Sequence, residues 1–493
     1  MAERGDLFLG FDVGTTTIKG ALFDAEGRLV AHAARPYPTA RPAPGVVEQD
    51  PRDWTDGVAR TMEALLIDDR AGRVAAVGLC GQANTDVFVG ADGTPLAPAI
   101  AWADNRAAPE AAALDAGVTQ DDRIAWWGAP LPIGASHVLA RMAWMARAKP
   151  NVFAATRHVL TPKDYCLRAL TGEAVADPMS NFFVVGLDLA YVDPLISRVA
   201  GARERLPRLR FFTDIVGEIA LGSSGRRAPV VAGTMDAWSG LIGAGVRRAG
   251  QGVYMSGTSE IVAIASARRI GAPGIVTFPT AAGLTVNAGP TQSGGDSLRW
   301  WGGVVGCDVE GVLALASRAD RNGRPILFLP HLEGERAPLW DAELRGAFIG
   351  LDRRAGGPDH ALAVLEGVAL SARMLCEACD AAAGEAPRRL YHAGGGARSD
   401  LWAQIKADCL GRPLDRISCL DAGCLGAAIM AAVGVGAYPS LAEAISAMTR
   451  VERSFEPDPR MSARYNAMYD AYARAARALR PFPLAADATH SRS

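Results

Sequence analysis

A repeated decapeptide limits the folds open to this chain more than any other feature. The stretch "GTTTIKGALF" begins at Gly14, and "GTSEIVAIAS" begins at Gly257, about half of the 493-residue chain later. Both copies open with Gly-Thr and a further hydroxyl side chain, and both place an isoleucine four residues after the glycine. Self-similarity at this spacing predicts two homologous halves, each with a Gly-Thr hairpin that faces a shared cleft. A chance match of so few positions is the alternative.

The residues around the first copy have the composition of a β-hairpin. Residues 8–11 and 18–23 have strand composition, and Gly14 allows a sharp turn between them. The tip of such a hairpin displays backbone N–H groups and polar side chains. The polar residues are Asp12, Thr15, Thr16, Thr17 and Lys19. Together they suit phosphate oxygens and a bound cation, although threonines are also common in strands for purely structural reasons.

The composition is that of a globular protein with a small-molecule partner. The chain has a net charge of -2, is 49% hydrophobic and 21% charged, and is long enough for roughly two to four domains. Its 51 basic and 53 acidic residues give no global electrostatic case for binding nucleic acid or an anionic membrane. Because the N-terminus lacks a signal-peptide pattern and no run of about 18 apolar residues occurs, we expect a cytoplasmic protein without a membrane span.

Strand-like and helical runs alternate along the chain. "VAAVGLCG" and "APVVAGT" are typical of strands, and "HALAVLEGVALSARMLCEACDAAAG" is typical of a helix, which predicts α/β organisation. We expect one domain over residues 1–245 and a second over 246–480. Residues 481–493 lack periodicity and are expected to form a disordered tail. The single C-x-x-C pair, Cys376 and Cys379, has no second ligand pair, so we expect no zinc site.

An aspartate lies in a glycine-lined turn near the middle of the chain. In "VVAGTMDAWSGLIGAGV", strand-like Val230 and Val231 lead through Gly233 to Asp236, and small residues follow. Small residues let a ligand or another backbone approach closely, and a carboxylate there could accept a proton or coordinate Mg²⁺. Capping of a helix N-terminus is the alternative for Asp236.

Three consecutive glycines precede a predicted helix late in the chain. "YHAGGGARSDLWAQIKADCLG" runs from a short strand through Gly394, Gly395 and Gly396 into that helix. Such a shelf can admit a flat base or a sugar against bare backbone, but Gly-rich turns also occur as pure structure. The chain has no Gly-Lys dipeptide, which excludes a P-loop.

Taken together, these motifs resemble the FGGY family of carbohydrate kinases, in the actin-like, ribonuclease-H-like ATPase superfamily. The resemblance covers nearly the whole chain. "GLCGQANTDVFVGADGTPLAPAIAWADNRA" resembles the family's early substrate segment, and "TPKDYCLRALTGE" is close to the xylulokinase stretch. "HVLARMAWMARAKP" resembles the first family signature with Arg141 where lysine is usual. "GAFIGLDRRAGGPDHALAVLEGVALSAR" resembles the second signature with Glu366 in place.

The resemblance implies an α/β fold of two such ATPase domains, with a cleft between them that closes over ATP and a sugar. By the same resemblance, Asp12 helps hold Mg²⁺ with ATP, and Asp236 is the general base. Four residues would line the phosphate path: Thr15, Thr16, Gly257 and Thr258. Gly395 and Gly396 would border the adenosine, and Gly295 in "QSGGDSLRWW" would lie near the nucleotide. Residues 421–428, "DAGCLGAA", would begin the helix that closes this side.

The segment expected to contact the sugar departs from the family pattern. A Met-His pair follows the glutamine in xylulokinases, and an Arg-Glu pair follows it in glycerol kinases. Here Ala83 and Asn84 follow Gln82. Asn84 can both donate and accept hydrogen bonds, which suits a polyhydroxylated ligand, and Ala83 leaves room for a different or larger substituent.

Downstream, Trp102, Asp104 and Arg106 fit the family's "W-x-D-x-R" pattern. Trp102 could pack against a sugar carbon chain, or belong to the core. Asp104 could bind sugar hydroxyls, or pair with Arg106. A ketopentose such as D-xylulose is the first expectation for the acceptor. Ribulose, erythritol, a branched ketose, a hexose derivative and glycerol are the alternatives.

A different class of function also follows from the superfamily, which includes actin-like ATPases that phosphorylate no sugar. The two sugar-kinase signatures argue against that interpretation. A sugar-binding regulator without kinase activity is the other alternative, but Asp12 and Asp236 are both present. Because relatives in the family are often dimers, the resemblance also puts a homodimer among the partners to test.

Overall fold

The computed structural model describes residues 5–222, 225–419 and 421–479. The predicted tail, residues 481–493, lies outside the described residues. The chain divides into two compact units. The first unit comprises Met1–Arg248, Thr277–Thr285 and Asp421–Arg450; the second comprises Ala249–Val276, Val286–Leu420 and Val451–Ser493. The expected boundary at residues 245 and 246 lies near the first crossing, but two later segments return to the first unit.

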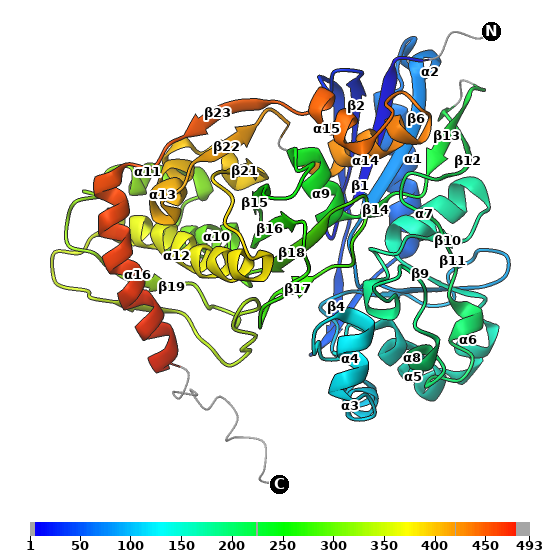
Figure 1. Ribbon diagram of the computed structural model, residues 1–493, viewed down its shortest axis with the longest axis horizontal. Helices are drawn as coiled ribbons and strands as arrows, with labels where there is room; N and C mark the ends of the chain where they lie inside the picture. Colours follow the sequence, from blue (N-terminus) through cyan, green and yellow to red (C-terminus); the bar gives the residue numbers. More distant parts are fainter. Residues whose placement is uncertain (1–4, 223–224, 420, 480–493) are drawn as a thin grey trace. The chain divides into compact units, whose positions relative to one another are not determined.

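The first unit is built on a mixed seven-stranded sheet with the order β12-β13-β6-β1-β2-β3, in which β14 also pairs with β6 (Figure 1). Its strands are β1 (Leu7–Val13), β2 (Thr17–Asp24), β3 (Leu29–Pro36), β6 (Val74–Gly81), β12 (Ile215–Ala220), β13 (Arg227–Val231) and β14 (Thr234–Met235). β1 pairs antiparallel with β2 and parallel with β6. The predicted first hairpin is therefore confirmed.

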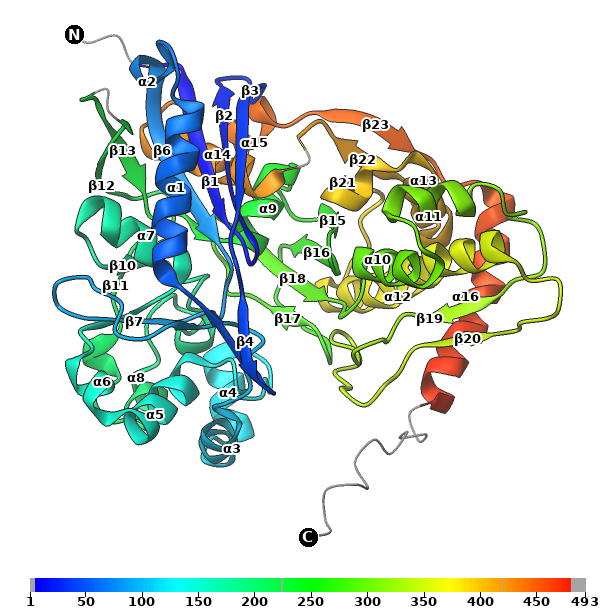
Figure 2. The same cartoon turned by 180° about the vertical axis from the view of Figure 1, so that it is seen from behind.

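Alternation along β1 sends side chains to two helical layers. Leu7, Leu9, Phe11 and Val13 join the apolar core that includes residues of α1 (Pro51–Leu65) and α7 (Pro162–Thr171). Figure 2 shows α1 lying along this face of the sheet. The other face of β1 packs against α14 (Ala422–Gly434), which in turn packs against α9 (Asp236–Ala244).

Glycines bring α14 into backbone contact with the sheet and with α9. A Cβ at Gly10 would lie 1.9 Å from the carbonyl oxygen of Cys424, and one at Gly78 would lie 2.0 Å from that of Ala427. A Cβ at Gly426 would similarly lie 1.9 Å from the carbonyl oxygen of Ser239. Glycine is needed at these positions because no side chain fits in the contacts. The contacts hold α14 against the sheet and α9, and residues 421–450 belong to the first unit despite their late position in the sequence.

Smaller elements complete the first unit between β3 and β12. They form short sheets β4-β5-β8, β7-β9 and β10-β11 with helices around them. The strands are β4 (Ala40–Ala43), β5 (Val46–Gln49), β7 (Val87–Val89), β8 (Ala99–Ile100), β9 (His158–Leu160), β10 (Val175–Ala176) and β11 (Arg208–Leu209). The helices are α2 (Arg70–Arg73), α3 (Ala108–Ala116), α4 (Gln120–Trp127), α5 (Val138–Ala148), α6 (Pro150–Ala155) and α8 (Asp193–Ile196); α15 (Leu441–Met448) follows α14.

The second unit repeats the arrangement around its own seven-stranded sheet, with the order β17-β18-β16-β15-β21-β22-β23. Its strands are β15 (Gly252–Ser256), β16 (Glu260–Ser266), β17 (Val276–Thr277), β18 (Thr285–Pro290), β21 (Leu390–Ala393), β22 (Leu414–Ile417) and β23 (Val451–Phe455). β15 pairs antiparallel with β16 and parallel with β21, as β1 does with β2 and β6. This shared topology confirms the duplication that the repeated decapeptide predicts.

Long helices pack on the second sheet. The core there joins residues of β15, β16, β21 and β22 to residues of α12 and α13. The helices are α10 (Gly295–Val305), α11 (Val309–Ala316), α12 (Gly357–Ala383), α13 (Asp400–Leu410) and α16 (Pro459–Leu479), and a small sheet pairs β19 (Leu327–Leu329) with β20 (Ala347–Ile349). Among the described residues, no helix has both the length and the apolarity needed to cross a bilayer.

The glycine contact beneath α14 predicts the effect of a single methyl group. Gly10→Ala should lower the free energy of unfolding by about 1–3 kcal/mol or more, because the new methyl would overlap a backbone carbonyl that cannot rotate away. Gly72→Ala is the matched control, since a Cβ at that position meets no atom within 4 Å. Thermal unfolding of both variants tests this expectation, and equal midpoints for the two would contradict it.

Candidate active site

Asp12 is the next-to-last residue of β1 and lies on the face that α14 covers. A Cβ at Gly423 would lie 3.0 Å from Asp12 Oδ2, so the carboxylate lies against the first turn of α14. Asp12 Oδ1 is buried and has no hydrogen-bond partner among the described residues. Burial raises the pKa of Asp12, and the positive charge of Lys19 opposes that shift. The site therefore has an inward-facing oxygen that a cation could satisfy.

Lys19 lies directly across the hairpin from Asp12 in the β1/β2 register. Its Nζ donates to Asp421 Oδ1 at 2.9 Å, and His32 Nε2 lies 3.2 Å from the other carboxylate oxygen. Burial disfavours the ammonium, but the ion pair with Asp421 raises the pKa of Lys19. Lys19 thus contributes positive charge behind the hairpin while being tied to the start of α14.

The hairpin tip is held from below by side chains of other segments. Gly14 N donates to Thr17 O at 3.2 Å, which closes the turn. Tyr37 donates its hydroxyl to Gly14 O and its backbone N–H to Thr16 O. Gln49 Nε2 donates to Thr15 O at 2.8 Å. Because these carbonyls are engaged, the threonine tip has a fixed conformation.

Asp236 is the first residue of α9. The residue at the N-cap position of α9 is Met235, so Asp236 is not the helix cap that the alternative interpretation expected. Asp236 Oδ1 accepts the N–H of Ala237 at 2.7 Å. Enclosure by protein and then the negative charge of Asp12 raise the pKa of Asp236 to about 7. A carboxyl group with this pKa can exchange a proton near neutral pH.

A buried ionic cluster, missed in the sequence, fixes the backbone that leads to Asp236. Lys163 Nζ lies 2.9 Å from Asp177 Oδ2, pairs with Asp164, and donates to Ala232 O at 3.2 Å. Thr234 Oγ1 donates to Asp177 Oδ1 at 2.7 Å. Lys163 belongs to "TPKDYCLRALTGE", which resembles other kinases, but only the fold shows that it lies beside the Asp236 turn.

Gln82 supports the hairpin from within the protein. It is 2% exposed, and its amide donates to Tyr37 and to Gln49 while its Oε1 accepts from Thr85. The expected sugar contact of Gln82 therefore competes with a complete set of internal hydrogen bonds. The following residues are more accessible: Ala83 and Asn84 are both partly exposed, and Asn84 has a positive φ of 52°.

Arg141 joins the two segments that are expected to contact sugar. Its fully buried guanidinium donates to Asn84 O at 2.6 Å, to Asp86 Oδ2 at 2.7 Å and to Ala101 O at 2.6 Å. A planar fork with several donors can serve these three oxygens at once. Arg141, at the position where the family usually has lysine, thus connects the Asn84 and Ala101 parts of the segment expected to contact the sugar.

Trp102 and Asp104 have different environments. Trp102 is 36% exposed, which excludes a core position, and its Nε1 donates to Thr15 Oγ1 at 3.3 Å. Asp104 is 1% exposed; Arg106 donates to both of its oxygens, and Val47 N donates to Oδ2. Asp104 is therefore paired with Arg106, which was the alternative to its binding of sugar hydroxyls. Trp102 is the member of the "W-x-D-x-R" motif that is exposed to solvent.

In the second unit, the structure brings three expected nucleotide residues together. Gly257 N donates to Ser259 O at 3.0 Å, which closes the second turn, and Gly257 and Thr258 are exposed at its tip. Gly295 N donates to Gly257 O at 2.9 Å, so the N-terminus of α10 adjoins this tip. These two N–H groups hold the turn, and the exposed hydroxyl and N–H of Thr258 at its tip suit phosphate oxygens.

The triple glycine packs against the strand that leads to the second tip. Gly394 has a φ of +86°, and a Cβ at Gly396 would lie 2.2 Å from Ser256 Oγ. Both positions thus need glycine for structural reasons. A Cβ at Gly395 would meet no atom within 4 Å, so this glycine borders open space.

Across the described part of the chain, no group of three His, Cys, Asp or Glu residues could hold a metal ion. The unpartnered oxygen of Asp12 could nevertheless serve as a single carboxylate ligand of a metal ion that is bound mainly by other groups. Mg²⁺ is usually held by one or two carboxylates, by substrate phosphates and by water. The residues present are therefore compatible with Mg²⁺ delivered with a nucleotide.

Comparison with known proteins covers nearly the whole chain. The models for the N-terminal and C-terminal domains of the FGGY family of carbohydrate kinases match residues 7–243 and 252–435. A xylulose kinase of Escherichia coli (strain K12) is 31% identical over 489 residues, covering 96% of this chain and 99% of that protein. An erythritol kinase of Brucella abortus (strain 2308) is 30% identical and covers 98% of both chains. The ligand-bound xylulose kinase from Lactobacillus acidophilus superposes with a TM-score of 0.87 at 25% identity, covering 97% of this chain and 99% of that chain.

The raised pKa of Asp236 predicts a pH-dependent cost to stability. Because the folded-state pKa of about 7 exceeds the usual 3.8, the stability that the protonated group contributes is lost as pH rises through 7. Asp236→Asn should therefore raise the thermal midpoint more at pH 8 than at pH 5. Asp56→Asn, at an exposed position, is the control. A gain for Asp236→Asn that does not grow with pH would refute the assignment.

Proposed function

Since this chain belongs to the FGGY family of carbohydrate kinases, we propose that it transfers the γ-phosphate of ATP to a hydroxyl group of a ketopentose, with D-xylulose as the first candidate. The chain is a sugar kinase with the two-domain α/β fold of that family. The observation that carries the proposed mechanism is the coupling of two buried carboxyl groups: the negative charge of Asp12 helps to raise the pKa of Asp236 to about 7, and Asp12 Oδ1 has no partner among the described residues.

Asp236 acts as the general base. Its carboxylate takes the proton of the acceptor hydroxyl as that oxygen attacks the γ-phosphorus, the bond to the β-phosphate oxygen breaks, and ADP leaves. A base with a pKa near 7 is about half ionised at neutral pH and still holds a transferred proton well. Ala237 N–H orients the carboxylate by donating to Oδ1.

Asp12 holds Mg²⁺ together with the phosphates of ATP. When bound, Mg²⁺ neutralises charge that develops on the phosphate oxygens. Lys19 adds positive potential behind this site, and its pairing with Asp421 keeps it from competing for Asp12. The carboxylates thus have separate roles, one toward the cation and one toward the acceptor proton.

The Gly-Thr tips bind phosphate. Thr15 and Thr16 offer hydroxyl and N–H groups in the first unit, with the Thr17 hydroxyl beside them, and Thr258 offers its hydroxyl and N–H in the second. Gly14, Gly257 and Gly295 use their own N–H groups to close and hold these turns. The fixed tip conformations support this role, because preorganised donors need no rearrangement when charge develops. Gly395 borders the adenosine, with Gly396 supporting that shelf from the Ser256 side.

The accessible residues of the sugar segment support a polyhydroxylated acceptor. Trp102 offers an apolar face, Asn84 offers an amide, and Ala83 leaves space beside them. Asp104 and Gln82 shape this surface through their internal hydrogen bonds. The xylulose kinase relative favours D-xylulose, and the erythritol kinase relative makes erythritol the second acceptor to test.

We also propose that the enzyme works in the cytoplasm, where ATP is available, and that it forms a homodimer. The dimer rests on the family resemblance alone. Light scattering of the purified protein measures the oligomeric state directly.

The central experiment measures ADP release with MgATP across D-xylulose, D-ribulose, erythritol, glycerol and a hexose panel. One acceptor should raise turnover many-fold over water. Asp236→Asn should lower that turnover by about 10² to 10⁴ while ADP binding persists, because only proton transfer is lost. Asp56→Asn should leave both unchanged. Turnover that ignores every acceptor would favour an ATPase of another kind.

Arg141 gives a separate prediction about the sugar segment. Arg141→Lys removes the planar fork and should raise the KM for the acceptor about tenfold, because Asn84 and Ala101 lose a shared donor. The KM for ATP should stay within about twofold, since no nucleotide group contacts this segment in the proposed site. Steady-state kinetics with each substrate varied in turn measures the two constants. Equal increases in both would indicate a general loss of structure.

A further inference from the structure

The second Gly-Thr tip depends on a neighbouring segment, residues 291–296, between β18 and the first turn of α10. Thr291 N donates to Glu260 O at 2.8 Å, and Glu260 N donates to Thr291 Oγ1 at 3.0 Å. Gly295 N donates to Gly257 O, and Asp296 N donates to Thr258 O at 3.3 Å. Segment 291–296 is thus hydrogen-bonded to the second Gly-Thr turn from its tip, at Gly257 and Thr258, to the start of β16 at Glu260.

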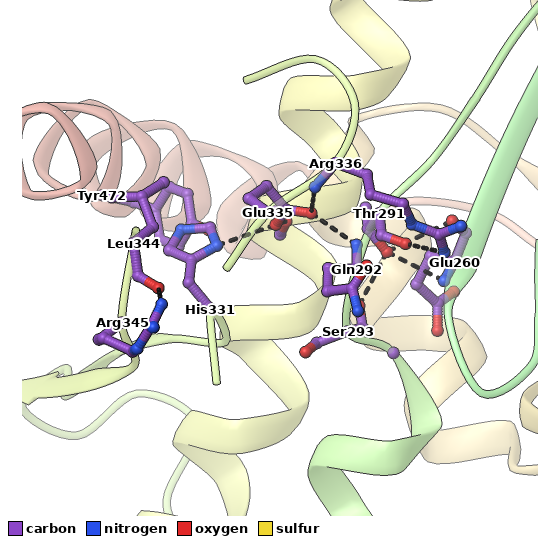
Figure 3. Close-up of polar contacts among 12 residues, drawn as sticks. Glu260, Thr291, Gln292, Ser293, His331, Glu335, Arg336, Leu344, Arg345 and Tyr472 are labelled. Atoms are coloured by element: carbon purple, nitrogen blue, oxygen red, sulfur yellow. Dashed lines mark hydrogen bonds and ion pairs between the residues drawn. The ribbon is translucent and has the colours of Figure 1, made fainter. Parts of the chain in front are cut away.

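Glu335 holds this segment from the opposite side. Figure 3 shows its carboxylate between the Gln292 backbone and the His331 ring. Oε1 accepts the N–H groups of Gln292 at 2.6 Å and Arg336 at 2.9 Å. Oε2 accepts from His331 Nδ1 at 2.9 Å and from Ser371 Oγ at 3.2 Å. The side chain is 2% exposed, so its four hydrogen bonds form away from water.

Arg336 makes a second contact with the same segment. Its guanidinium donates to Thr291 O at 2.6 Å, one residue before the contact made by Glu335 (Figure 3). Neighbouring residues of one loop therefore fix successive residues of segment 291–296. The segment has little room to move toward the tip, because a Cβ at Gly294 would lie 2.7 Å from the Ser259 carbonyl carbon.

From these contacts we propose that Glu335 and Arg336 are positioning residues for nucleotide binding. They hold segment 291–296, and that segment donates Gly295 N–H and Asp296 N–H to the carbonyls of Gly257 and Thr258, which fixes the conformation of the tip that faces the ligand. The inference rests on the proposed function, since it assigns these turns to the phosphates of ATP and ADP. Neither Glu335 nor Arg336 contacts the nucleotide in this account.

The chemistry of the carboxylate makes a specific test available. A leucine at position 335 has no acceptor oxygen, so the N–H groups of Gln292 and Arg336 lose their shared partner. Glu335→Leu is more informative than glutamine, because a glutamine amide could donate to His331 Nδ1 and Ser371 Oγ and restore the contacts. Arg336→Met removes the other contact while retaining an unbranched apolar stem of comparable reach.

The matched control is Asp415→Leu on β22. Asp415 is likewise buried and accepts from Arg389 through both oxygens and from Ser454. It lies in the same sheet, three strands from β16. This variant therefore reports on the general cost of altering a buried, hydrogen-bonded carboxylate in the second unit.

Isothermal calorimetry with MgADP, and the KM values for ATP and acceptor, test the proposal on the full-length protein. Glu335→Leu and Arg336→Met should each weaken MgADP binding about tenfold and raise the KM for ATP, with the KM for the acceptor unchanged. Asp415→Leu should leave all three quantities unchanged. Wild-type affinity in both variants, or equal losses in all three, would overturn the proposal. Wild-type protein that binds MgADP but turns over no acceptor would refute the proposed function and leave this inference intact.

Discussion

The close approach of α14 to β1 and β6 is the constraint on which the first unit depends. Glycines at 10, 78 and 426 let carbonyl groups take the place that side chains would fill. Ser239 Oγ and Cys80 Sγ both donate to Gly423 O, at 2.8 and 3.5 Å, which anchors the first turn of the helix. The position of Asp12 relative to that turn is therefore set by backbone packing, which is less adjustable than side-chain packing.

The two hairpins share a topology but are supported in different ways. Polar side chains of distant segments hold the first tip, whereas a buried ion pair lies beneath the second, where Lys406 Nζ is 3.2 Å from Glu260 Oε2. The first strand also has Asp12 as its next-to-last residue, and the second copy has Met255 at the equivalent position. Duplication thus supplied two similar turns, and only one of them carries the carboxylate expected to hold a cation.

Much of the fold follows from local sequence signals. The repeated decapeptide predicts both hairpins, and the structure confirms both. They are predictable because Gly-Thr turns between apolar strands are determined locally. The Asp236 turn was also found, since glycine and small residues mark it directly. The family resemblance implies the roles proposed for these residues. Those roles cannot be inferred from the periodicity of the sequence or from the spacing of its motifs.

The missed features depend on residues far apart in the sequence. Lys19 pairs with Asp421 across 402 positions, and Arg141 reaches Asn84 across 57. Residues 421–428 begin α14, as the resemblance implies, and the described contacts place them against Asp12 and Lys19. No local pattern reveals such partners, because a buried charge is satisfied by whatever the tertiary fold brings to it.

The late position of α14 has a consequence for synthesis of the chain. The first unit has its strands and its apolar core early, but the helix that covers one face of β1 and β6 ends at Gly434. On the ribosome, roughly nine-tenths of the protein must therefore emerge before that face is covered. Until then the glycine-lined surface is open to chaperones, and the second unit is made while the first is still incomplete.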